Sequence, residues 1–202
     1  MITALRATSR TIADFLQAEF EADPALEDFF APPGTFRVYL NTPAEMSGRA
    51  GLSVWLYRVV RDESTLNRPP ERVSATLTRR VPLPVRLHYL FTPITHSEED
   101  DALETEQAIL GKVLQSFHDH PQLFGTDLRD DFEGTGSLIT VRLEGLSVDE
   151  LTRIWDALEA SYRTSISYEA TVIDIEAGVQ PELGPPVRVP RAETGVIVGA
   201  GG

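Results

Sequence analysis

The architecture of this chain follows from one stretch near its middle, Val85-Arg86-Leu87-His88-Tyr89-Leu90-Phe91. Val85, Leu87, Tyr89 and Phe91 form one set of alternate positions, and Arg86, His88 and Leu90 form the other. This two-residue period is typical of a β-strand that lays one face on a core. The sequence therefore predicts a half-buried strand over residues 81–92, and the segments around it supply its neighbours.

Several segments on either side have the composition of further strands. Residues 51–60 form a nearly continuous apolar run, as expected of a strand that is covered on both faces. Shorter β-prone runs lie at residues 36–40, 139–143 and 165–176. Residues 61–84 are polar and bear several prolines, with one strand-like patch at residues 73–77. This segment is predicted to form a long excursion or a hairpin.

Three amphipathic helices complete the pattern. The first covers residues 3–20. The second begins after a capping pattern at Ser97 and ends at Pro121. The third opens on a capping box formed by Ser147 and Glu150. Four of its apolar residues are expected to face inward: Leu151, Ile154, Trp155 and Leu158. The order of elements predicts an α+β fold, a mixed or antiparallel β-sheet packed with about three α-helices.

The C-terminal segment differs in kind from the body, which we place at residues 1–177. Ten of the 25 positions in residues 178–202 are Gly or Pro, so we expect an extended tail. The tail also carries two β-prone triplets, Val187-Arg188-Val189 and Val196-Ile197-Val198. They suit a segment that adds a strand to the sheet edge of a neighbouring subunit. A disordered tail is the alternative.

Composition excludes several classes of partner and of chemistry. The 202 residues carry a net charge of −13, which disfavours nucleic acid and anionic membranes as partners. The absence of cysteine excludes disulfides and thiolate chemistry. The first residues lack the pattern of a signal peptide, and no apolar run has the length of a membrane span. We therefore expect a soluble protein that is made in the cytoplasm.

The charge is distributed unevenly along the chain. Residues 37–86 hold nine arginines against four acids, whereas residues 98–133 hold eleven acids against Lys112 and Arg129. Two solvated faces would explain this pattern. A subunit that meets its neighbours head to tail would explain it equally. Arg79 and Arg80, which precede the central strand, either protect a sheet edge or contact an acidic neighbour.

No motif in the sequence indicates catalysis, a cofactor or a metal. The C-terminal run Val-Ile-Val-Gly-Ala-Gly-Gly imitates a dinucleotide-binding turn, but no helix follows it. His118 and His120 supply only two ligands of a possible zinc site and suit a helix C-terminus. Nucleophile-elbow, phosphate-loop and zinc-protease patterns are absent. One alternative remains, a small hydrolase or binding domain that uses the acidic loop of Asp127, Asp130, Asp131 and Glu133.

Four stretches, in this order and spacing, resemble a known family. They are Ser53-Val54-Trp55-Leu56-Tyr57-Arg58-Val59 with Leu66-Asn67-Arg68, residues 82–93, residues 108–123, and Leu146-Ser147-Val148-Asp149-Glu150-Leu151 with Trp155 and residues 162–168. Together they resemble the N-terminal cap domain of tube-terminator (cap) proteins in phage-tail-like contractile injection systems. The resemblance covers residues 3–176.

The resemblance implies a structural protein without catalysis or cofactor. It implies a homohexameric ring that sits on the last layer of an inner tube protein and a sheath protein and stops their polymerisation. It also implies assembly in the cytoplasm into a phage-tail-like particle. An assembly factor or chaperone for tail components is the alternative. We expect partner contacts at nine residues: Arg79, Arg80, Val187, Arg188, Val189, Arg191, Val196, Ile197 and Val198.

Overall fold

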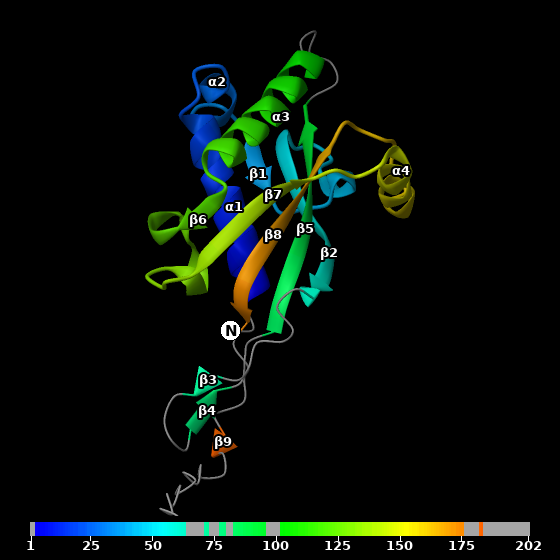
Figure 1. The fold of residues 1–202 in the computed structure, drawn as a ribbon. Coiled ribbons are helices and arrows are strands. Elements are labelled where there is room, and N and C mark those ends of the chain that lie inside the picture. Colours follow the sequence, from blue (N-terminus) through cyan, green and yellow to red (C-terminus); the bar gives the residue numbers. More distant parts are fainter. Residues whose placement is uncertain are drawn as a thin grey trace, which may run out of the picture.

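A six-stranded mixed β-sheet forms the centre of the computed structural model (Figure 1). The structure describes residues 3–63, 71–72, 77–79, 83–95, 102–175 and 182–183. The strands of this sheet are β1 (Arg37–Tyr39), β2 (Gly51–Arg61), β5 (Leu83–Ile94), β6 (Gln122–Phe124), β7 (Leu138–Glu144) and β8 (Ile166–Ile175). Their order is β1-β2-β5-β8-β7-β6, with β1 parallel to β2 and the other pairs antiparallel. The predicted α+β fold with a mixed sheet is confirmed.

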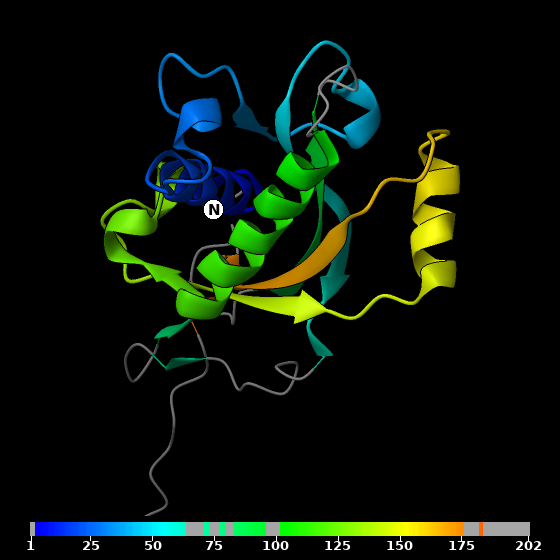
Figure 2. The same cartoon turned by 90° about the horizontal axis from the view of Figure 1, so that it is seen from above.

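Helices lie on both sides of the sheet. They are α1 (Ala4–Glu21), α2 (Glu27–Phe30), α3 (Ala102–Asp119) and α4 (Val148–Ala157). Short 3₁₀ turns follow β1 and α3: η1 (Pro43–Glu45), η3 (Gly125–Asp127) and η4 (Asp130–Phe132). Figures 1 and 2 show α1 and α3 on one side of the sheet and α4 on the other. The three predicted helices are confirmed, and α2 adds a single turn that the sequence pattern did not indicate.

The core lies between the sheet and the α1–α3 layer. Val85, Leu87, Tyr89 and Phe91 are all buried there, which is the alternation that the sequence predicted. Phe91 packs edge to face against Phe117 of α3 at a ring distance of 5.8 Å. Burial of each such side chain stabilises the fold by roughly 1.5–3 kcal/mol, so this one strand anchors both helices to the sheet.

The burial predicted for the two long strands is reversed: residues 51–60 were expected to be covered on both faces, and residues 81–92 on one face only. Strand β5 is buried on both faces, because His88 and Leu90 on its second face are 5% and 0% exposed. It lies between β2 and β8 in the middle of the sheet. Strand β2 is buried only in its first half, since β1 pairs with residues 51–53 alone and leaves the rest of β2 at an edge. Val59 in that second half is 47% exposed.

The predicted capping box at the start of α4 is present. Of the four apolar residues of α4 that were expected to face inward, only one is fully buried. The Ser147 side chain accepts a hydrogen bond from the Glu150 amide at 3.3 Å, and the Glu150 carboxylate accepts one from the Ser147 amide at 2.9 Å. Trp155 is the helix's buried residue, at 3% exposure. Leu151, Ile154 and Leu158 are half-buried rather than fully inward-facing.

A separate three-stranded sheet has the order β3-β4-β9, formed by β3 (Glu71–Arg72), β4 (Leu77–Arg79) and β9 (Glu182–Leu183). Strands β3 and β4 are antiparallel, so of the two alternatives predicted for residues 61–84, a long excursion or a hairpin, the structure has the hairpin. The strand-like patch predicted at residues 73–77 overlaps β4 at Leu77, and residues 73–76 lie outside the described residues. The sheet lies beyond the ends of β5 and β8 (Figure 1). Ser97, the predicted cap of α3, falls outside the described residues. No helix in the described ranges has both the length and the apolarity that crossing a membrane requires.

Candidate functional site

Only one of the nine predicted contact residues belongs to the described part of the chain. Arg79 ends β4 and is paired by its backbone with Glu71 of β3. The proposed edge protection of residues 81–92 does not apply, because β5 has paired strands on both sides. Arg80 and the tail residues Val187, Arg188, Val189, Arg191, Val196, Ile197 and Val198 lie outside the described residues. Their partner contacts stay predictions.

The start of the tail pairs with its own chain. Leu183 lies opposite Leu77, and Glu182 lies opposite Thr78, in an antiparallel pair. Sequence reasoning missed this strand because Glu182 and Leu183 stand between Pro181 and Gly184 and have little β-propensity. The signal that could have located it is the unpaired outer side of a two-stranded hairpin, which invites a third strand.

The acidic loop does not form the convergent site that the hydrolase alternative requires. The Asp127 carboxylate accepts a hydrogen bond from the Phe124 amide at 3.3 Å, and Asp130 forms an ion pair with Arg6 at 3.2 Å. Asp131 and Glu133 are exposed. Among the described residues no three His, Asp or Glu side chains are placed to hold a metal ion. The carboxylates of this loop act separately, as caps and surface charges.

A partly buried polar cluster occupies the second face of the sheet, and no sequence motif indicated it. Four side chains form this Glu144 cluster, one from each of four strands: Tyr57, His88, Glu144 and Ser167. The Ser167 hydroxyl donates to Glu144 Oε2 at 2.8 Å, and the Tyr57 hydroxyl donates to the same oxygen at 3.1 Å. His88 Nδ1 lies 3.0 Å from Glu144 Oε1. The cluster links β2, β5, β8 and β7.

The ionisation of the Glu144 cluster follows from these contacts. Burial opposes ionisation of Glu144, but hydrogen bonds from Ser167, His88 and Tyr57 outweigh it and lower the pKa of the carboxyl group. Burial, together with the neighbouring Glu144 charge, raises the pKa of Tyr57 to about 12. The anion is therefore held by three donors in a site that is closed to most solvent.

The Glu144 cluster lacks the arrangement of a nucleophilic centre. In a Ser–His centre the histidine accepts from the serine hydroxyl, but here His88 Nδ1 contacts Glu144, and the Ser167 hydroxyl donates to that same carboxylate. His88 Nε2, the nitrogen that would act as base, is buried and has no hydrogen-bond partner among the described residues. The geometry thus favours a structural tie between strands. A neighbouring ion pair on the same face joins Arg86 to Asp62 at 2.7 Å.

Exposed acidic residues lie on both sides of the sheet, since α4 carries Asp149, Glu150 and Asp156, all exposed. Acidic residues project from α3 and from the η4 loop that packs on α1; they include Glu104, Asp119, Asp131 and Glu133. Arg58 is exposed on the side of α4, because it pairs in register with His88 of the second face. Part of the arginine surplus is used internally, since Arg37 donates to three backbone carbonyl groups and Arg86 is paired. Arg58 and Arg153 stay exposed and are available for contact with an acidic surface.

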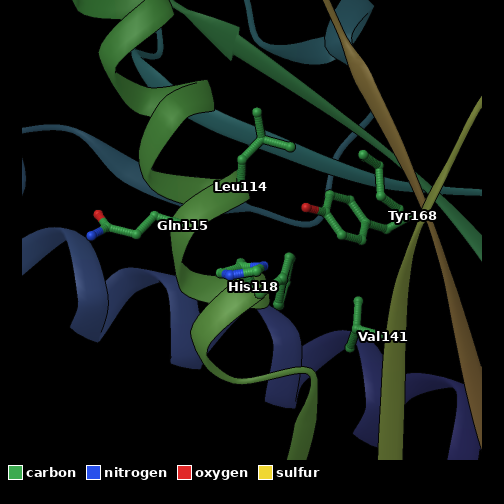
Figure 3. Close-up of a pocket in the computed structure, with 7 residues that line it drawn as sticks. Leu114, Gln115, His118, Val141 and Tyr168 are labelled. Carbon is green, nitrogen blue, oxygen red and sulfur yellow. The ribbon is translucent and has the colours of Figure 1, made fainter.

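An open groove of about 510 Å³ lies between α3 and the β7–β8 pair (Figure 3). Its lining is mostly apolar: Leu114, Gln115, Phe117, His118, Val141, Leu143 and Tyr168. Leu114 and Leu143 are 38% and 59% exposed. Figure 3 shows the Leu114, His118 and Val141 side chains around the open space, with Tyr168 behind it. The groove holds no pair of acid and base groups, so it suits an apolar segment better than a reaction.

This fold is shared with terminator and cap subunits of contractile injection systems. One solved structure, the sheath/tube terminator of the extracellular contractile injection system PVC in its extended state, matches 99% of this chain and 64% of that chain, with a TM-score of 0.59 and 17% identity. A second, the tube-terminating cap of the anti-feeding prophage, matches 97% of this chain and 61% of that chain, with a TM-score of 0.59 and 19% identity.

The chain belongs to the Pvc16 N-terminal domain family, whose model matches residues 7–189. This membership confirms the resemblance drawn from the four sequence stretches. No curated protein matches the chain. The chain spans less than two thirds of the length of either terminator structure that it matches.

Proposed function

We propose that this protein is a ring-forming tail terminator, which caps the distal end of the inner tube and sheath of a contractile injection system. The observation that carries the proposal is the family match over residues 7–189, joined to the shared fold with two terminators. The family of this chain and the fold that it shares with a terminator subunit and a cap subunit support the same role. That role needs interaction surfaces rather than a reaction.

The proposed ring is homohexameric and closes through head-to-tail contacts. A heterologous contact uses two different surfaces on each subunit, and it forms a closed ring when the rotation closes. Exposed acidic residues of α3, such as Asp119, and the exposed Arg58 of β2 supply one pair of opposite charges for such a contact. A closed ring completes the tube on one face and offers no equivalent layer on the other, so addition of tube and sheath subunits stops.

Tail contacts are the second element of the proposal. Arg79, Arg80 and the tail residues 187–198 would meet a ring neighbour or the sheath. The backbone pairing of β9 with β4 supports this by placing the start of the tail beside Arg79. The particle would be assembled in the cytoplasm and act outside the cell, and the likeness to a terminator of an extracellular contractile injection system supports the second part.

Charge reversal tests the ring directly. We expect the purified chain to form rings of six subunits, alone or on tube ends, by light scattering and negative-stain imaging. Arg58→Glu should weaken the ring, and Asp119→Lys in the same chain should restore part of it if the two charges meet across the contact. Arg10→Glu, an exposed arginine on α1, is the matched control. Absence of the protein from purified particles would favour the assembly-factor alternative instead.

A further inference from the structure

The outer side of β7 is only partly covered by β6. Strand β7 pairs with β8 over residues 139–144, but β6 reaches only residues 138–140. The last contact on that side is a hydrogen bond from the Val141 amide to the Pro121 carbonyl oxygen, at 2.9 Å. Within the described ranges no strand lies beside residues 142–144 on their outer side.

The backbone of Leu143 is directed at this uncovered side. In an antiparallel ladder the N–H and C=O groups of successive residues point to alternate sides. Because the Val141 amide points toward β6, the amide and carbonyl of Leu143, two residues further, point the same way. They meet no paired strand there. A sheet edge of this kind accepts an added strand.

The groove lies next to the same edge. Val141 and Leu143 line it from β7, and Leu114, Phe117 and His118 line it from α3. A strand placed along residues 142–144 would lay every second side chain into this space. The edge therefore supplies hydrogen-bonding groups and the groove supplies an apolar pocket, the two elements that strand addition uses.

One segment of this chain has matching chemistry. Residues 194–202 carry no charge and contain the β-branched triplet Val196-Ile197-Val198 between two glycines. The triplet has the same number of residues as the uncovered segment of β7, residues 142–144. The other triplet, Val187-Arg188-Val189, carries an arginine and runs directly into Pro190, which has no amide to donate. The last triplet is the better occupant of an apolar groove.

We propose that residues 196–198 of a second copy of this chain add as a strand to residues 142–144 of β7, with Ile197 opposite Leu143 and its side chain in the groove. Twelve residues, 184–195, separate β9 from this triplet, and an extended chain of that length spans up to about 40 Å. The tail is therefore long enough to reach a neighbouring subunit. The inference rests on the ring proposed above, because each subunit would give one tail and receive another.

Cross-linking tests the pairing in the full chain. The protein has no cysteine, so introduced thiols are the only ones present. We would mix a Leu143→Cys chain with an Ile197→Cys chain, allow rings to form and add a short thiol-specific cross-linker. A cross-linked dimer is expected for this mixture. In the control mixture a Leu103→Cys chain replaces the Leu143→Cys chain. It should give at least fivefold less cross-linked dimer, because Leu103 does not line the groove, even though it is 72% exposed.

Three outcomes of cross-linking overturn the inference. Rings of native mass without a Leu143–Ile197 cross-link would show that the ring exists but the strand addition does not. A cross-link that forms within a chain carrying both Leu143→Cys and Ile197→Cys, but not in the mixture of single variants, would show that the tail fills its own groove. A cross-link to a sheath or tube protein in particles, at the expense of the dimer, would assign the edge to another occupant.

A second measurement does not depend on ring formation. Hydrogen exchange of the Leu143 amide would be followed in a full-length Ile197→Asp chain, whose own tail is unsuited to an apolar groove. Adding a peptide of residues 193–202 in excess should slow this exchange at least tenfold, and a peptide with Ile197→Asp should not. Unchanged exchange with the wild-type peptide would overturn the inference even if rings form. Slowed exchange without rings would retain the edge site and count against the ring.

Discussion

The Nδ1 atom of His88 lies 3.0 Å from Oε1 of Glu144, although the two residues belong to strands that are not neighbours. Strand β8 lies between them, and its Ser167 hydroxyl donates to the same carboxylate. The contact therefore ties β5 to β7 across a third strand. Since β7 also carries the uncovered edge, the Glu144 cluster holds in place the strand on which the proposed tail contact depends.

Glu144→Gln should destabilise the protein by about 1–3 kcal/mol, the range for removing a charged, hydrogen-bonded partner from a buried group. Three donors point at this carboxylate, and an amide satisfies them poorly. Chemical denaturation would measure the loss. Glu133→Gln, an exposed acid in the η4 loop, is the control and should change stability little. A Glu144→Gln chain as stable as the wild type would contradict the structural role of the cluster.

The same substitution has a defined pH dependence. Because the folded protein lowers the pKa of Glu144, this group stabilises the fold above its unfolded pKa of about 4.3. That contribution is lost as the pH falls through the lowered folded pKa. The stability difference between wild type and Glu144→Gln should be largest near neutral pH and shrink below about pH 4. A difference that grows on acidification would have the wrong sign.

Trp155 permits a paired test of α4. Its ring is 3% exposed, and its Nε1 has no hydrogen-bond partner among the described residues. Trp155→Ala should cost about 3–5 kcal/mol through lost packing. Trp155→Phe should cost much less, because it keeps an aromatic ring and removes an unpaired N–H group. Thermal unfolding would compare the two, and equal losses would show that the indole N–H matters more than the ring.

The capping box of α4 gives a local prediction. Ser147→Ala removes the side chain that accepts from the Glu150 amide, and it should cost about 1 kcal/mol. Thr152→Ala, which changes an exposed residue later in the same helix, is the control. Circular dichroism during denaturation would record both midpoints. The cap has no stabilising role if the two variants unfold alike.

Two glycine substitutions should act in opposite directions. Gly51 has a φ of +131°, and a β-carbon there would collide with the Arg37 backbone of β1. Gly51→Ala should therefore destabilise the β1–β2 pair by about 1–3 kcal/mol. Gly111 lies within α3 with open space around it, so Gly111→Ala should stabilise by up to about 1 kcal/mol. A Gly51→Ala chain that unfolds at the wild-type denaturant midpoint would contradict the described β1–β2 contact.

Sequence patterns predicted the long elements because local period and caps report directly on helices and strands. The alternation through Tyr89 and Phe91 and the capping box at Ser147 are examples. Exposure was harder to predict, since the burial of His88 depends on the two neighbouring strands rather than on its own segment. Strands β6 and β9 were missed, because two or three residues are too few to show a period.

The Glu144 cluster could not be predicted from spacing. Tyr57 and Ser167 are 110 positions apart in the chain, and only the sheet order brings them within 3.2 Å. The groove likewise joins the second half of α3 to two strands that follow it. In contrast, the family was indicated by four ordered stretches, because each one is a local sequence pattern.

The most direct measurement of the terminator role is the length of tubes grown in its presence. Tube and sheath proteins would be polymerised with and without the purified chain, and lengths and end densities recorded by electron microscopy. The account predicts shorter tubes as the chain is added, with a ring of extra density on one end only. Tubes that keep growing at the same rate, with bare ends at saturating protein, would contradict it.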